Sequence, residues 1–215
     1  KNRLPVFALK PAPVQVTYLG YPTTTGLPAM DYRLTDAIVD PEGEDRWYSE
    51  RLLRLPDTMW CYRPHERLPA VAPPPCLSNG YVTFGSLNHA AKLSPQVIEL
   101  WARLLKLLPE ARLIATRIRG ERAQEKLRKD LERLGVAAGR AELHDVRARE
   151  TIGELFSRID IGLDPFPYGG TTTTCDLLWM GVPLVSLSGK TTPSRSGASL
   201  LNAVGLGELV ARTAE

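Results

Sequence analysis

Cysteine is scarce in this sequence. Its 215 residues include three cysteines, Cys61, Cys76 and Cys175, and no two of them form a Cys-x-x-Cys pair. An odd number of separated cysteines indicates neither a disulfide framework nor a zinc site. His65 and His144 add no metal-ligand spacing. We therefore expect no bound metal and a reducing, cytoplasmic location.

Long hydrophobic runs are also missing. No apolar stretch approaches the roughly 18 residues needed to cross a bilayer, and the first residues lack the hydrophobic segment of a signal peptide. The formal net charge is only +3, because 27 Lys and Arg residues face 24 Asp and Glu residues. That balance is too small to indicate a nucleic-acid-binding surface. We expect neither a membrane nor a nucleic acid as a partner.

The remaining composition is typical of a globular protein, with 43% hydrophobic and 24% charged residues. Proline is unevenly distributed, since twelve of the 18 prolines lie in residues 1–80. Four of them crowd into residues 69–75, and such a segment should form neither a helix nor a central strand. We therefore expect an extended, proline-rich linker over residues 69–80, between a region 1–68 and a region 81–215.

The N-terminal region contains few elements. Residues 14–21 and 31–40 are typical of strands, residues 47–55 of a short helix, and the residues before them of a loop. These elements cannot cover both faces of a sheet. We expect residues 1–68 to be the C-terminal part of a Rossmann-like domain whose other strands precede Lys1, in a longer protein.

Downstream of the linker, short apolar strands alternate with amphipathic helices, the first of which starts at the N-cap candidate Ser94 and Pro95. Strands linked by helices imply right-handed crossovers and a parallel sheet. We therefore expect an α/β fold with a Rossmann-like domain over residues 81–215. The expected strands are 81–87, 111–118, 141–146, 161–166 and 183–188, and the expected helices are 94–109, 121–135, 148–160 and 171–181.

A candidate phosphate site lies in residues 164–181, DPFPYGGTTTTCDLLWMG. Here a strand ends, two glycines allow a close backbone approach, and four threonines open a helix whose free N–H groups attract phosphate oxygens. The carboxylate of Asp176 could accept hydrogen bonds from vicinal sugar hydroxyls. The structural alternative is that the threonines cap the helix and the glycines make a turn. Neither GxGxxG nor a P-loop motif is present, which argues against NAD and P-loop nucleotide sites.

A second candidate segment is the loop after the strand 81–87. Asn88, His89 and Lys92 lie there, at the carboxyl end of a strand where ligands of such sheets collect. A lysine at this place can neutralise a diphosphate. The alternative is a solvated surface lysine beside a structural histidine.

Several blocks of the sequence, when they occur together in this order, are specific to one family of proteins. They are GYPTTTG with MDYRLTD, YVTFGSLNHAAKLSP before a Trp-bearing helix, LDPFPYGGTTTTCDLLWMGVPLVSLSG, and SRSGASLL. Over nearly the whole chain they resemble the catalytic region of O-linked N-acetylglucosamine transferases, the SPINDLY-like glycosyltransferases and their bacterial homologues. The resemblance implies a GT-B fold, with two Rossmann-like domains facing a cleft, usually preceded by tetratricopeptide repeats that bind the acceptor protein. It also implies UDP-GlcNAc as the donor substrate, with no cofactor, and an inverting, metal-independent transfer to Ser or Thr hydroxyls of an acceptor protein or peptide.

The resemblance also assigns roles to residues. Lys92 matches the lysine that offsets charge on the UDP leaving group, which makes it the expected catalytic residue. Thr172 and Thr173 match phosphate-binding threonines, and Asp176 matches the carboxylate that binds the ribose. The full set of UDP-binding positions that it implies is Asn88, His89, Lys92, Arg147, Arg149, Ile152, Gly170, Thr171, Thr172, Thr173 and Asp176, with the two arginines beside the uracil and ribose.

Three of these positions depart from the family pattern. His89 stands where the family commonly has Gln, and Thr171 stands where the animal enzymes have His. Ile152 stands where the family usually has a His that stacks on uracil, and Ile offers apolar contact without a π face. The departure at Ile152 keeps open a GT-B enzyme for another nucleotide sugar or acceptor.

A non-catalytic module that binds nucleotide sugars is the other alternative, because the candidate catalytic histidine of the family belongs to a segment upstream of Lys1. The second domain would likewise continue beyond Glu215. An upstream tetratricopeptide array with an intact catalytic histidine would favour the protein transferase.

Overall fold

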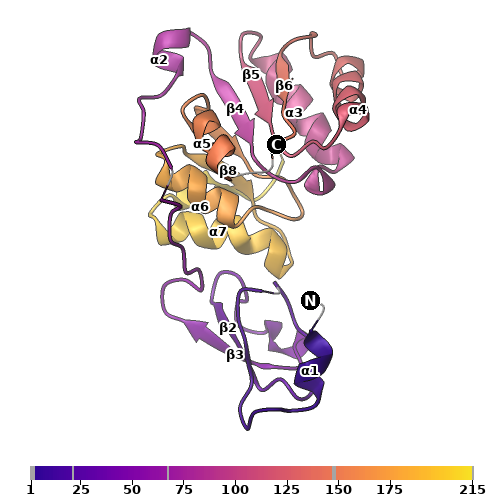
Figure 1. Ribbon diagram of the computed structural model, residues 1–215, viewed down its shortest axis with the longest axis vertical. Coiled ribbons are helices and arrows are strands. Elements are labelled where there is room, and N and C mark those ends of the chain that lie inside the picture. Colours follow the sequence, from indigo (N-terminus) through magenta and orange to yellow (C-terminus); the bar gives the residue numbers. More distant parts are fainter. Residues whose placement is uncertain (1–2, 21, 67, 147–148, 215) are drawn as a thin grey trace.

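The computed structural model describes residues 3–20, 22–66, 68–146 and 149–214. It contains two parallel sheets, one in each half of the chain, and Figure 1 shows them in two units stacked along the long axis. None of the described helices is both long and apolar enough to cross a membrane.

The N-terminal unit contains a three-stranded sheet in the order β1-β2-β3, formed by β1 (Val16–Thr17), β2 (Tyr32–Asp36) and β3 (Arg51–Leu55). The prediction of a helix over residues 47–55 is wrong. A 3₁₀ turn, η1 (Glu44–Trp47), precedes β3, which pairs with β2 along its whole length. The extended form buries Leu52 and satisfies the backbone groups of β2, which a short isolated helix could not do. The expected loop at the start of the chain likewise contains a short helix, α1 (Leu4–Ala8).

The linker is also more ordered than the sequence indicates. Its end forms a one-turn helix, α2 (Cys76–Asn79), although the prolines predicted no helix there. Pro75 occupies the N-cap position, where the missing N–H costs nothing, and Gly80 ends the turn with a positive φ of 74°. The Asp160 carboxylate accepts the N–H groups of Cys76 and Thr83, both at 2.8 Å, and so ties the linker to the sheet.

The C-terminal unit confirms the expected parallel α/β fold. Its six strands run parallel in the order β6-β5-β4-β7-β8-β9. Counted along the chain from β4, this order is 3-2-1-4-5-6, that of doubly wound dinucleotide-binding sheets. The strands are β4 (Thr83–Ser86), β5 (Arg112–Ala115), β6 (Ala141–Leu143), β7 (Ile161–Leu163), β8 (Leu184–Leu187) and β9 (Val210–Ala211).

Helices cover the sheet and form two apolar clusters with it. The first joins Trp101 and Leu105 of α3 to Leu127 and Leu131 of α4, and the second involves α5, α6 and α7. The predicted start of α3 is confirmed, because Ser94 caps it through Oγ. The helices are α3 (Pro95–Leu107), α4 (Glu121–Arg133), α5 (Arg149–Phe156), α6 (Thr172–Trp179) and α7 (Thr192–Ala203), with 3₁₀ turns η2 (Ala90–Lys92) and η3 (Gly207–Leu209).

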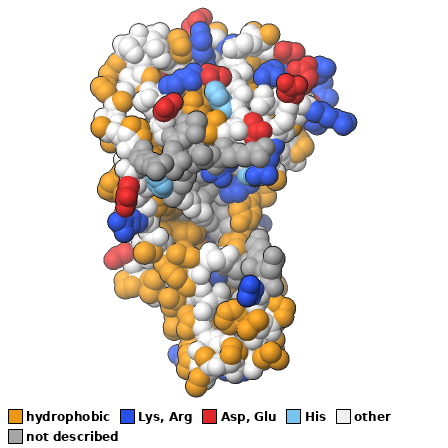
Figure 2. Space-filling model, viewed as in Figure 1, with side chains coloured by type: hydrophobic (Ala, Val, Ile, Leu, Met, Phe, Trp, Pro, Cys, Tyr) orange, Lys and Arg blue, Asp and Glu red, His pale blue; other side chains and the backbone are white. Residues whose placement is uncertain are grey.

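The outer face of α4 is solvated, as its charge pattern predicts. Ion pairs one turn apart, such as Lys126 with Asp130 and Lys129 with Glu125, run along it. Figure 2 shows charged side chains of both signs gathered over the end of the molecule where α4 lies. Such exposed pairs contribute little to stability.

The two units meet along α7, which lies on the side of the upper unit that faces β2 and β3 (Figure 1). Two buried carboxylates of the N-terminal unit accept hydroxyl groups of this helix. Thr192 donates to Asp40 Oδ1 at 2.6 Å, and Ser199 donates to Asp36 Oδ2 at 2.7 Å. Because buried carboxylates are costly without partners, these contacts hold the units in one arrangement.

Candidate functional site

The candidate site lies at the switch point of the C-terminal sheet, between β4 and β7. From β4 the chain adds β5 and β6 on one side of the sheet, and then β7, β8 and β9 on the other. The strands β4 and β7 are neighbours, with Phe84 opposite Ile161 and Gly85 opposite Gly162, but the helices that follow them cover opposite faces. Their carboxyl ends therefore mark the switch point of the sheet, the usual ligand position in such folds. The two loops that leave this point, residues 87–92 and 164–171, belong to the two candidate segments of the sequence, residues 85–95 and 164–181.

Lys92 joins the two loops. Its Nζ donates to the carbonyl oxygen of Gly169 at 2.6 Å and lies 3.3 Å from Asn88 Oδ1 and 4.5 Å from the ring centre of Tyr168. Burial lowers the pKa of Lys92, the negative charge of Asp164 opposes this shift, and the positive charge of Arg117 reinforces it. The ammonium group of Lys92 therefore lies next to the loop that contains Gly169 and Gly170.

The start of α6 forms the other wall. Thr171 occupies the N-cap position without a side-chain cap, and Thr172 and Thr173 form the first turn, where the N–H groups have no intrahelical partner. Thr173 Oγ1 lies 3.4 Å from Asn88 Oδ1, which ties the helix to the first loop. A Cβ at Gly170 would lie 2.5 Å from Thr174 Oγ1, so this close approach needs glycine. The backbone amides and hydroxyls suit an anionic oxygen ligand.

Asp164 is a site residue that sequence reasoning missed. It follows β7 and is 7% exposed, with Oδ1 accepting the Gly170 N–H at 2.6 Å and Oδ2 accepting the Ser186 hydroxyl at 2.8 Å. The carboxylate therefore holds the loop that contains Gly170 in place beside the start of α6. An acidic residue that closes a buried strand five positions before a Gly-Gly pair is the signal that could have identified it.

Burial raises the pKa of Asp164 to about 6 from 3.8, so the folded protein binds this proton more tightly than the unfolded chain. The contribution of Asp164 to the unfolding free energy should therefore fall by about 3 kcal/mol as the pH rises from about 3 to about 7. Asp164→Asn, which stays neutral, should gain stability relative to the wild type over this range. Denaturant unfolding of the full-length protein at both ends of the range measures it, with Asp57→Asn as an exposed control. Parallel curves for the wild type and Asp164→Asn would contradict the assignment.

Arg117 was also missed. It follows β5 beside β4, adopts a left-handed backbone with φ +59°, and has a buried Nε with no hydrogen-bond partner among the described residues. A left-handed conformation in a non-glycine residue is unusual and often marks a functional position. Side-chain type alone carries no signal of that conformation, which explains the omission.

The side chains of the remaining predicted positions either make other contacts or lie outside the described residues. Asp176 lies one turn into α6, is 3% exposed, and accepts the hydroxyl of Tyr62 at 2.6 Å. His89 caps η2 by accepting the Ala91 N–H through Nδ1 at 3.1 Å. Arg147 lies outside the described residues. The predicted positions Arg149 and Ile152 belong to α5, but their side chains also lie outside the described part of the chain.

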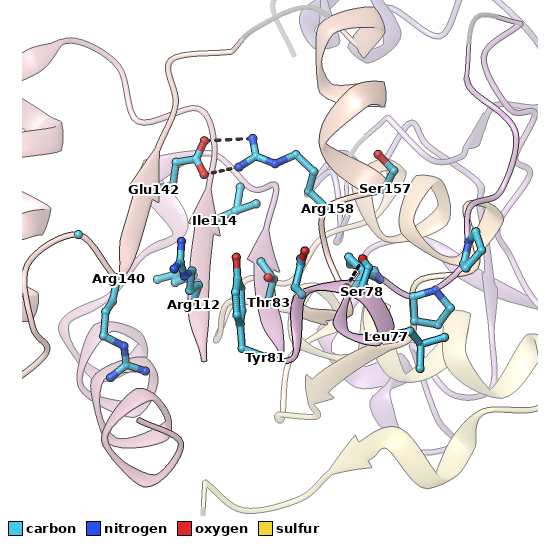
Figure 3. Close-up of a pocket in the computed structure, with 16 residues that line it drawn as sticks. Leu77, Ser78, Tyr81, Thr83, Arg112, Ile114, Arg140, Glu142, Ser157 and Arg158 are labelled. Carbon is cyan, nitrogen blue, oxygen red and sulfur yellow. Dashed lines mark hydrogen bonds and ion pairs between the residues drawn. The ribbon is translucent and has the colours of Figure 1, made fainter. Parts of the chain in front are cut away.

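A cavity of about 640 Å³ opens at the opposite, amino edge of the sheet. Its charged side chains have structural partners, as Figure 3 shows for Arg158, which pairs with Glu142. Arg140 donates to the carbonyl of Leu108 at 2.7 Å, and the guanidinium of Arg112 lies 4.4 Å from the ring centre of Tyr81. Within the described ranges, no cluster of three or more His, Cys, Asp or Glu side chains could hold a metal ion.

Comparison with known proteins identifies the family. The family model for glycosyl transferase family 41 matches residues 1–71 and 75–215. The chain belongs to this family. The protein of Hordeum vulgare named "Probable UDP-N-acetylglucosamine--peptide N-acetylglucosaminyltransferase SPINDLY" is 44% identical over 215 residues, which are 99% of this chain and 23% of that protein. The protein of the same name from Arabidopsis thaliana is 45% identical over 214 residues, again 23% of its length.

A solved structure supports the assignment to glycosyl transferase family 41. An O-GlcNAc transferase variant of Thermobaculum terrenum is 41% identical and superposes with a TM-score of 0.92, over 99% of this chain and 40% of that one. The expected family and its GT-B fold are therefore confirmed. The chain spans less than a quarter of the length of the two SPINDLY relatives.

Proposed function

We propose that this chain is the donor-binding part of an inverting glycosyltransferase, which moves N-acetylglucosamine from UDP-GlcNAc to Ser or Thr hydroxyls of an acceptor protein or peptide. The observation that carries the proposal is the meeting of Lys92 with the Gly169 carbonyl beside the open start of α6. Together they place a positively charged side chain and unpaired helix-start amides at the switch point of the sheet. The names of the SPINDLY relatives support the same donor and acceptor class.

In this proposal the described residues act on the leaving group. The bond from the anomeric carbon to the UDP oxygen breaks while the acceptor hydroxyl bonds to that carbon from the opposite face, which inverts its configuration. Lys92 and the first-turn amides of α6 stabilise the negative charge that develops on UDP. Asp164 keeps the Gly170 amide in place through its 2.6 Å hydrogen bond. The acceptor proton passes to a general base of the full-length protein, a role that we assign to none of the described residues.

The same charges make a divalent cation unnecessary in this proposal, because Lys92, Arg117 and the helix start offset the diphosphate charge. We expect transfer by the full-length protein to continue at its normal rate in excess EDTA. The assay measures UDP release with UDP-GlcNAc and a Ser-containing acceptor. Loss of transfer in EDTA, with recovery on adding Mg²⁺ or Mn²⁺, would contradict the metal-free mechanism.

The same assay separates this function from its alternatives. Acceptor-dependent UDP release with a glycosylated product supports the protein transferase. Binding of UDP without turnover would indicate a non-catalytic module. Faster turnover with a nucleotide sugar of another base would favour the alternative of a GT-B enzyme with a different donor. The presence of Ile152, where the family usually has a stacking His, leaves that alternative open. The cytoplasm is the proposed location, since the sequence has only three cysteines and no Cys-x-x-Cys pair.

A further inference from the structure

We propose that Tyr62 of the N-terminal segment is a positioning residue for the donor nucleotide, and that it acts through the carboxylate of Asp176. Tyr62 lies in the stretch that leads from β3 toward the linker, 114 positions away from Asp176 in the sequence. The inference rests on the proposed function and on the ribose-binding role that the family resemblance implies for Asp176.

The contact between them is direct. The Tyr62 hydroxyl donates to Asp176 Oδ1 at 2.6 Å, and the ring of Tyr62 packs against Trp179 with centroids 6.5 Å apart and planes tilted by 56°. Asp176 and Trp179 both lie on α6, so Tyr62 contacts the helix at two points. Asp176 is only 3% exposed, and a polar group so enclosed is costly to bury unless hydrogen-bond donors reach it.

A second contact fixes the segment that carries Tyr62. Two residues earlier, Trp60 Nε1 donates to Ser199 Oγ at 3.0 Å, and Ser199 in turn donates to Asp36 of β2 at 2.7 Å. The backbone N–H of Met59 also donates to Asp36, at 2.9 Å. The segment is therefore anchored to both units before it reaches α6, and the position of the Tyr62 hydroxyl follows from how the units dock.

This arrangement has a chemical consequence for the nucleotide. A carboxylate has about four acceptor directions, and a donor that fixes one oxygen also fixes the direction of the others. Two ribose hydroxyls require a set orientation of their acceptor, whereas a phosphate bound to amides and Lys92 does not involve Asp176. Tyr62 should therefore affect binding of the nucleoside part and leave diphosphate binding unchanged.

The test compares Tyr62→Phe with Tyr48→Phe in the full-length protein. Tyr48 also makes a buried contact between the units, because its hydroxyl donates to Asp40 and lies beside Thr192 of α7, but that contact does not involve α6. Calorimetric titration should show UDP affinity falling about three- to tenfold in Tyr62→Phe, the range of a typical single hydrogen bond. Pyrophosphate affinity should stay within about twofold, and Tyr48→Phe should bind both ligands like the wild type.

A double variant shows whether Tyr62 acts through Asp176. If it does, adding Tyr62→Phe to Asp176→Asn should weaken UDP binding much less than adding it to the wild type. Independent, additive losses would overturn the proposal, and so would equal losses for UDP and pyrophosphate or an unchanged UDP affinity in Tyr62→Phe. These outcomes leave the proposed function intact, whereas a wild type that binds no UDP would overturn both.

Discussion

Replacing Lys92 by alanine should weaken UDP binding by about ten- to a hundredfold, because a charge-assisted contact of this kind contributes roughly 1.5–3 kcal/mol. Turnover should fall further. A donor that stabilises a developing negative charge typically contributes about a hundred- to a thousandfold to the rate. Titration with UDP and an acceptor-dependent transfer assay on the full-length protein measure the two effects. No larger effect is expected from any single described side chain.

The matched control is Lys129→Ala, which removes an exposed lysine of α4 that pairs with Glu125. This variant should bind UDP and turn over like the wild type. Since Lys92 also bonds to the Gly169 carbonyl, a thermal melt must accompany the titration. Unchanged UDP affinity and turnover in a folded Lys92→Ala protein would show that the diphosphate binds elsewhere.

Replacing Asp176 by asparagine should separate the nucleoside from the phosphate. We expect UDP affinity to fall about tenfold or more, because the ribose loses a charged acceptor, while pyrophosphate, which has no ribose, should bind nearly as before. Competition titrations of the two ligands on the wild type and Asp176→Asn measure the difference.

The structural alternative for Asp176 makes a different prediction. If the carboxylate only stabilises the first turns of α6, the variant should lose about 0.3–1 kcal/mol of stability and bind both ligands almost normally. A lower melting temperature with intact UDP binding would support that alternative. Equal losses for UDP and pyrophosphate would mean that the helix start itself is damaged, and the ribose assignment would be wrong.

The main features of the site could be predicted from the sequence because they depend on local chemistry. Ser94 followed by Pro95 is a strong signal for the start of a helix. Two glycines before a run of threonines indicate a helix start whose N–H groups are left for a ligand. That the two loops meet follows from the parallel sheet, since the carboxyl ends of its strands share one edge. The direct contact of Lys92 with Gly169 needed the strand order, which places β4 beside β7.

The features that sequence reasoning missed depend on distant packing. Residues 51–55 are typical of a helix when they are taken alone, and pairing with β2 makes them a strand. The helix α7 has small polar residues, Ser196 and Ser199 among them, on its buried side, so it lacks the hydrophobic periodicity of an amphipathic helix. Asp164 is buried only because a loop folds over it, and the contact of Tyr62 with Asp176 spans the two units.

A crystal structure of the full-length protein with UDP would test the central claim most directly. The diphosphate should lie between Lys92 Nζ and the first-turn amides of α6, with the ribose near Asp176 and no metal ion bridging the phosphates. A diphosphate bound instead in the amino-edge cavity beside Arg112 and Arg140, or held by a divalent cation, would contradict the account.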